Sequence, residues 1–201
     1  MRSIFALLAF CLAMLTTGFA QDAARPKASN VSRENFLSVD DYLRLLPRTD
    51  QMQRVRDAAK GRDAFESFRE NWPTQTGNYH LNMVHLSAGV RLRCDLTVAV
   101  SEAQAQHVQS ESYKGTIDGL KGAGELNVTA VRGLESWNPN GQFYLVALRG
   151  GAPLANVLLP RQGNNVAVIL LRGPLLFEDA DSIRAFLDPK IKALMSFKPV
   201  F

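Results

Sequence analysis

Residues 90–100 of this 201-residue chain read VRLRCDLTVAV, and two kinds of side chain alternate along them. Every even position is aliphatic except Cys94, whereas arginine, aspartate and threonine occupy the odd positions before Ala99. Successive side chains of a β-strand point to opposite faces of its sheet. The period of two therefore predicts an antiparallel strand with one face in the core and the other in solvent.

Other stretches of the chain resemble this strand and are joined by short turns. Small and turn-forming residues separate them, as at 87–89, Gly150-Gly151 and 162–165. Connections this short join antiparallel neighbours, so the last three strands are predicted to form a meander. The strands predicted in addition to 90–100 are 79–83, 126–131, 143–148, 154–159 and 166–171.

Helices are predicted before these strands, over a helical segment at 36–73. Ser38 precedes two aspartates, which places a capping side chain and negative charge at a helix start. Pro47 ends that helix, and Thr49 or Asp50 begins a second pattern. The apolar residues of the second pattern recur at three- and four-residue spacing: Met52, Val55, Ala59, Phe65, Phe68 and Trp72.

The end of the chain returns to a helical pattern. Asp179 or Asp181 is placed to cap one helix, and Asp188 before Pro189 is typical of the start of another. The polar stretch 101–125 fits a short helix, a loop or an irregular edge strand equally well.

These elements predict an α+β fold. N-terminal helices come first, then an antiparallel sheet of roughly six strands that ends in a meander, then C-terminal helices packed on one face. The segment 74–201 is accordingly expected to be an antiparallel β domain that carries the C-terminal helices.

The first twenty residues have the layout of a cleavable signal peptide. Arg2 is followed by an uncharged apolar run over 4–15, and Ala20 ends a small-residue cleavage motif. The run is shorter than the roughly twenty residues that span a bilayer. We therefore expect a signal peptide at 1–20, a flexible leader at 21–35, and a periplasmic or secreted protein without a transmembrane segment in its mature part.

Charge and cysteine content restrict the partners and the chemistry. Basic and acidic residues are interspersed, with a net charge of +4 for the whole chain, so nucleic acid is not an expected partner. An envelope protein is the partner class that export suggests. Cys94 is the single cysteine after the signal peptide, which rules out a disulfide within the mature chain.

Motifs for catalysis or metal binding are sparse. No nucleophile elbow, zinc-binding spacing or phosphate loop is present, so we expect neither a metal nor a cofactor. Cys94 lies on the apolar side of its strand, where a thiol stays protonated. A small hydrolase or transferase that uses His85, Asp95 or Cys94 remains an alternative, because His85 precedes the same strand.

Aromatic and arginine side chains are the candidate ligand-binding residues, since such groups line sugar and peptide grooves. They are Trp137, Arg132, Tyr144 and Trp72. The leading hypothesis is an exported, non-catalytic protein with a binding or envelope-assembly role. A carrier of a small apolar ligand within the sheet is the first alternative.

Overall fold

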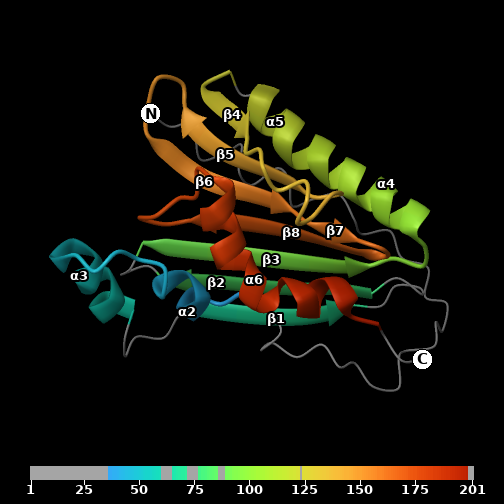
Figure 1. Ribbon diagram of the computed structural model, residues 1–201, viewed down its shortest axis with the longest axis horizontal. Coiled ribbons are helices and arrows are strands. Elements are labelled where there is room, and N and C mark those ends of the chain that lie inside the picture. The colour runs from blue at the N-terminus through green and yellow to red at the C-terminus, as the bar shows by residue number, and fades with distance from the viewer. Residues whose placement is uncertain (1–35, 60–64, 72–76, 86–88, 123, 199–201) are drawn as a thin grey trace.

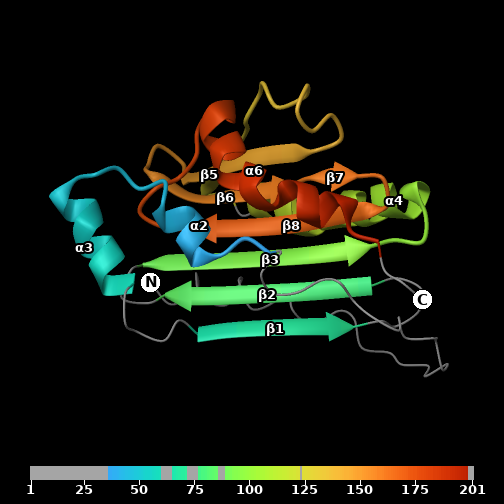
Figure 2. The same ribbon diagram turned by 60° about the horizontal axis from the view of Figure 1, so that its bottom comes forward.

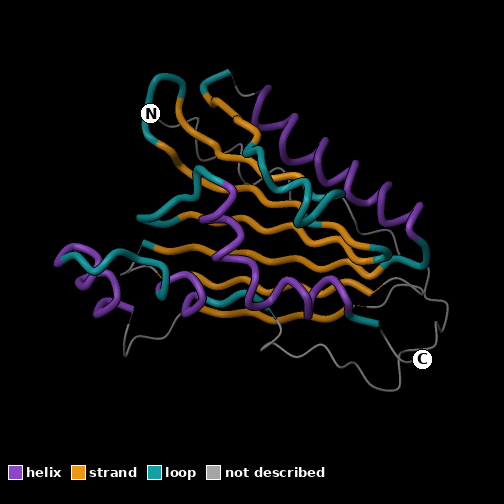
Figure 3. The backbone as a smooth tube through the Cα atoms, viewed as in Figure 1, coloured by secondary structure: helices purple, strands orange, loops and turns teal. Residues whose placement is uncertain are grey.

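The computed structural model describes residues 36–59, 65–71, 77–85, 89–122 and 124–198, with the backbone alone at 65–71 and 77–85. The predicted signal peptide, the leader and Trp72 lie outside these ranges. In the described part of the chain, eight strands form one antiparallel sheet (Figures 1 and 3) in the order β1-β2-β3-β8-β6-β5-β4, with β7 paired to β8. The strands are β1 Phe65–Asn71, β2 Gly77–His85, β3 Val90–Val98, β4 Leu126–Ala130, β5 Gln142–Leu148, β6 Pro153–Leu159, β7 Arg161–Gln162 and β8 Asn165–Arg172.

Helices cover both faces of this sheet. Alternate residues of β8 divide between two apolar clusters, with Ile169 in one and Val168 and Leu170 in the other. The first cluster includes α2 and α6 residues, and the second includes Ile117 of η4. The helical elements are α2 Val39–Leu43, α3 Asp50–Ala59, α4 Glu102–Tyr113, the π-helical turn η4 Lys114–Asp118, α5 Gly119–Gly122 and α6 Ala180–Ser196.

The α+β prediction is confirmed, and the strand prediction was right for β2, β3, β4, β5, β6 and β8. The C-terminal helix packs on one face as expected, and Figure 2 shows α2 on the same side. The stretch 101–125, for which the sequence fitted a helix, a loop or an edge strand, is mainly helical, since α4, η4 and α5 occupy it. These three elements contact the face of the sheet opposite α6.

The predicted helical segment is wrong in its second half. Helix α3 ends at Ala59, and Phe65–Asn71 is the edge strand β1. Its residues Phe65 and Phe68 match helical spacing, but a seven-residue stretch is too short for periodicity to separate helix from strand. β1 pairs with β2 along its whole length, which gives it backbone hydrogen bonds on one side, and this tertiary contact overrides the local pattern.

A single helix, α6, replaces the two helices predicted at the C-terminus. Asp179 caps it, accepting a 2.8 Å hydrogen bond from the Ser182 backbone N–H, and Pro189 lies inside it. Proline removes one helical hydrogen bond and crowds the carbonyl four residues earlier, here that of Ala185. That carbonyl accepts a hydrogen bond of 2.7 Å from the Arg44 guanidinium. Arg44 therefore compensates the interruption, and the helix continues.

Tyr42 connects α2 to the loop between β8 and α6. Its side chain is fully buried, and its hydroxyl donates to the Leu175 carbonyl at 2.9 Å and accepts from the Leu175 N–H at 2.6 Å. Burial raises the pKa of Tyr42 to about 12. Gly173 lies against the ring, where an added Cβ would come within 2.8 Å of Tyr42 Cζ. The loop is thus held to α2 before α6 begins.

Candidate functional site

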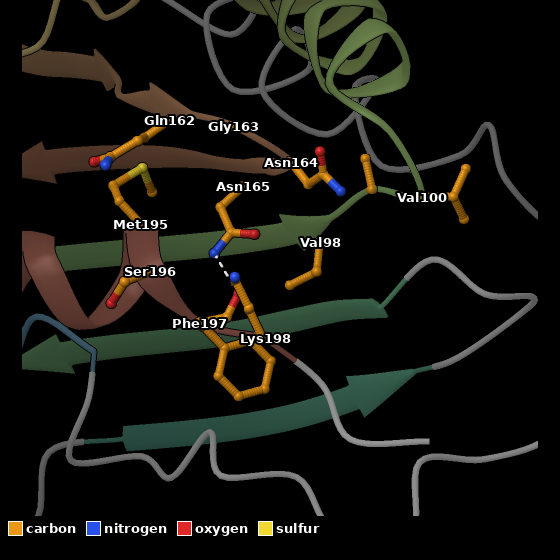
Figure 4. A pocket seen from close by; sticks show the side chains of 11 residues that line it. Val98, Val100, Gln162, Gly163, Asn164, Asn165, Met195, Ser196, Phe197 and Lys198 are labelled. Carbon is orange, nitrogen blue, oxygen red and sulfur yellow. Dashed lines mark hydrogen bonds between the residues drawn. The ribbon is translucent and has the colours of Figure 1, made fainter.

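A pocket of about 640 Å³ opens at one end of the sheet, at the last residues of β3 (Figure 4). Among the described residues, three segments line it: 98–100 at the end of β3, 162–165 in the hairpin of β7 and β8, and 195–198 at the end of α6. We call this the end pocket. Its volume falls within the range of roughly 300–1,000 Å³ that is usual for small-molecule sites.

The hairpin of β7 and β8 forms one wall because its turn is tight. Gln162 pairs with Asn165, so the turn itself consists of Gly163 and Asn164. Gly163 has a φ of 52°, a left-handed conformation that glycine adopts without a steric penalty. The Asn164 carbonyl accepts a 2.9 Å hydrogen bond from Ala99 N–H, which holds the hairpin against the end of β3.

Asn165 connects this wall to the helix. Its side chain is buried, and its amide nitrogen donates to the carbonyls of Leu194 at 2.8 Å and Phe197 at 2.9 Å. Figure 4 shows the bond to Phe197 crossing between the hairpin and the last turn of α6. Carbonyls at a helix C-terminus lack partners within the helix. Asn165 satisfies one of these carbonyls and fixes where α6 ends.

The end pocket is apolar inside and polar at its rim. Val98, Met195 and Phe197 are buried and supply the apolar part. The exposed residues at the rim are Val100, Gln162, Gly163, Asn164, Ser196 and Lys198. Lys198 is the one charged side chain among the described lining residues. Such a surface suits a ligand with an apolar body and a hydrogen-bonding or anionic end.

The carrier hypothesis placed a pocket between the strands of the meander. The end pocket lies instead at the end of the sheet, at the turn between β7 and β8. Leu158 and Ile169, on the neighbouring strands β6 and β8, are fully buried in the cluster under α6. Val157 is 1% exposed in the cluster on the other face. The middle of the meander is therefore packed with side chains on both faces.

The predicted ligand residues with described side chains do not share one groove. Trp137 packs against Phe143, with ring centroids 6.1 Å apart, on the side of α6. Its indole N–H donates to the Asp188 carboxylate at 2.8 Å, so its polar edge already has a partner within the chain. Asp188 thus bonds Trp137 instead of capping a second helix.

Tyr144 lies on the opposite face of the sheet. Its ring is 5.9 Å from that of Tyr113, and burial, followed by the effect of Tyr113, raises its pKa to about 12. Arg132 is exposed and near enough to Tyr144 to lower that pKa slightly. Arg132 is thus within electrostatic range of Tyr144, whereas Trp137 belongs to the other layer. Ligand binding by these residues stays a prediction.

The residues of the enzymatic hypothesis are not assembled. Cys94 is fully buried, and burial followed by the charge of Asp95 raises its pKa well above the usual range. Asp95 forms an ion pair of 2.7 Å with Arg93. His85 is the register partner of Val90, which places it four residues along β3 from Cys94, or about 13 Å at ~3.3 Å per residue. Burial keeps the Cys94 thiol protonated, and a protonated thiol is not an activated nucleophile.

Within the described residues, no three His, Cys, Asp or Glu side chains gather as metal ligands would. No helix in that part of the chain combines the length and the apolar character needed to cross a bilayer.

Comparisons with known proteins add little. No family model matches the chain, and no curated protein matches it. One solved structure, the extracellular domain of PknH from Mycobacterium tuberculosis, aligns over 84% of this chain and 98% of that chain, with 11% sequence identity and a TM-score of 0.40. A similarity at that level does not support an inference about function. The function is therefore inferred from the residues of the chain itself.

The residues that build the end pocket were not found from the sequence. Asn165 is the last residue of the predicted turn at 162–165, and a polar residue at an inward strand position could have indicated a buried amide with backbone partners. Lys198 gives no local signal, since its place at the rim depends on where α6 ends.

Asn165→Ala is predicted to destabilise the protein, because it removes both hydrogen bonds to the end of α6 and leaves buried carbonyls without partners. The expected loss in the free energy of unfolding is about 1–3 kcal/mol. Asn164→Ala is the matched control: its side chain is exposed, its backbone bond to Ala99 is retained, and a change under ~0.5 kcal/mol is expected. Urea unfolding measures both, and equal losses would contradict the role given to Asn165.

Proposed function

We propose that this chain is an exported, non-catalytic binding protein that holds a small ligand in the end pocket. The observation that carries the proposal is the pocket itself, with about 640 Å³ of space, an apolar interior and Lys198 at its rim. The signal-peptide pattern at 1–20 supports export to the periplasm or the exterior. An envelope-assembly role fits the same export and would use the bound ligand or a neighbouring surface.

The lining chemistry favours binding over turnover. Buried Val98, Met195 and Phe197 offer apolar contact, which contributes roughly 25 cal/mol for each Å² removed from water. The amide nitrogen of Asn165 already donates to the carbonyls of Leu194 and Phe197. Lys198 would attract an anionic end group without forming a covalent bond to it. The ligand class is therefore an amphipathic molecule such as a medium-chain fatty acid.

Filling the end pocket is predicted to weaken ligand binding without unfolding the protein. Ser196 is an exposed lining residue, so Ser196→Trp places an indole in the space with little disturbance of the core. Displacement of the fluorescent probe 1-anilinonaphthalene-8-sulfonate by laurate should weaken by about tenfold or more, which corresponds to ~1.4 kcal/mol. The neutral analogue dodecanol separates the role of charge from that of apolar contact.

Two variants serve as controls for this experiment. Ser110→Trp makes the same change at an exposed position of α4 outside the pocket, and laurate binding should stay as in the wild type. Lys198→Glu should weaken laurate about two- to fivefold and leave dodecanol unchanged, because an exposed ion pair contributes ~0.2–1 kcal/mol. Laurate affinity that is the same in the wild type and in Ser196→Trp would exclude the end pocket as the binding site.

Export is tested by the mass of the native protein in fractionated cells. Cleavage after Ala20 predicts a chain that begins at Gln21 and is recovered outside the cytoplasm. A cytosolic chain that retains Met1 would refute the exported role and leave the pocket without its proposed setting.

A further inference from the structure

Two arginines face each other at the far end of the junction between β3 and β8. Arg91 and Arg172 are direct register partners on these adjacent antiparallel strands. Directly opposed residues of an antiparallel pair project from the same face, with Cβ atoms about 4.5–5.5 Å apart. Both side chains are exposed. We call them the cross-strand arginine pair.

These arginines differ from the other strand arginines whose side chains the structure describes. Arg93 has a carboxylate partner in Asp95 at 2.7 Å, and Arg161 has one in Glu102 at 3.4 Å. Arg91 and Arg172 have no carboxylate partner among the described residues. Like charges that are directly opposed across two strands destabilise a sheet. Within the described ranges, the pair therefore places two positive charges without a carboxylate partner at one exposed position of the sheet.

The geometry of the guanidinium group indicates what would balance these charges. Each arginine presents a planar fork of N–H donors that matches phosphate or carboxylate oxygens two at a time. A carboxylate offers two oxygens and one negative charge, whereas a phosphate monoester offers three free oxygens and a charge of about −1.5 to −2 at neutral pH. A phosphate can accept from both forks at once and match the charge of the pair.

We propose that Arg91 and Arg172 form a binding site for a phosphate group, clamped between the two guanidinium groups at the exposed end of the β3–β8 junction. This site is separate from the end pocket. Arg91 lies seven residues before Val98 along β3, which corresponds to about 23 Å of extended strand at ~3.3 Å per residue. Its success or failure in a test is therefore independent of ligand binding at the end pocket.

Thermal unfolding of the purified protein in inorganic phosphate tests the site, with sodium chloride at equal ionic strength to account for screening. A ligand at free concentration c that binds the folded state raises the free energy of unfolding by RT ln(1 + c/Kd), so the rise in melting temperature reports its affinity. We expect phosphate to raise the melting temperature of the wild type more than chloride does, and more than acetate does. In Arg91→Gln and Arg172→Gln, the phosphate affinity derived from these shifts should fall about tenfold or more, since each variant loses charge-assisted hydrogen bonds.

The variants also have a distinct behaviour without phosphate. Removing one of two opposed charges relieves their repulsion, so each variant should melt at or above the wild-type temperature in low salt and below it in phosphate. Lys192→Gln is the control: it removes one positive charge from an exposed position of α6 and should leave the phosphate response intact. A phosphate response that is equal in the wild type and both arginine variants, or no larger than that of chloride, would overturn the proposal.

The phosphate group can belong to a soluble ester or to a lipid headgroup, and sedimentation with vesicles separates these sources. Binding to vesicles that contain phosphatidic acid, whose headgroup is a phosphate monoester, but not to phosphatidylcholine vesicles, lost in both arginine variants, would support the site and assign a lipid. Stabilisation by phosphate without such vesicle binding would support the site and assign a soluble ester. Vesicle binding that both variants retain would count against the site as the lipid contact.

Discussion

The antiparallel pairing of β3 with β8 joins residues that are far apart in the sequence, from Arg91 opposite Arg172 to Val98 opposite Asn165. On one side of this junction lie β1 and β2, and on the other lie β6, β5 and β4. Without it, the described strands would form two smaller sheets. Bringing the two strands together closes a long loop, which costs conformational entropy. A favourable free energy of burial at the junction must offset this cost.

That gain comes from burial on the face under α6. Leu92, Leu96, Ile169 and Leu171 are fully buried there, and each such side chain contributes about 1.5–3 kcal/mol on leaving water. The same alternation exposes Arg91 at one end of the junction and brings Asn165 inward at the other. Asn165 anchors α6 and shapes the end pocket, whereas Arg91 and Arg172 are left in solvent. The two proposed sites therefore lie at opposite ends of the β3–β8 pairing, the arginine pair at one end and the end pocket at the other.

Much of this fold follows from local patterns. The alternation at 90–100 and the short turns of the meander placed the central strands, and the polar residues before α2 and α6 marked both helix starts. The capping box of Ser38 with Asp41 is one such local feature, with a bond of 2.7 Å from the Ser38 N–H to the Asp41 carboxylate. What could not be predicted depends on contacts between distant residues. Strand β1 is set by its pairing with β2, and the continuity of α6 through Pro189 depends on Arg44. The separation of Trp137 from Tyr144 follows from the layering of the sheet between two sets of helices.

Native-state hydrogen exchange across the sheet tests whether β3 and β8 unite it into one cooperative unit. The interior amides of both strands, between Leu92 and Val98 and between Ala167 and Leu171, should exchange slowest, with one common free energy of opening equal to that of global unfolding. Amides of β3 that exchange through an opening in which β5, β6 and β8 remain protected would show two independently stable parts and contradict the proposed role of the junction.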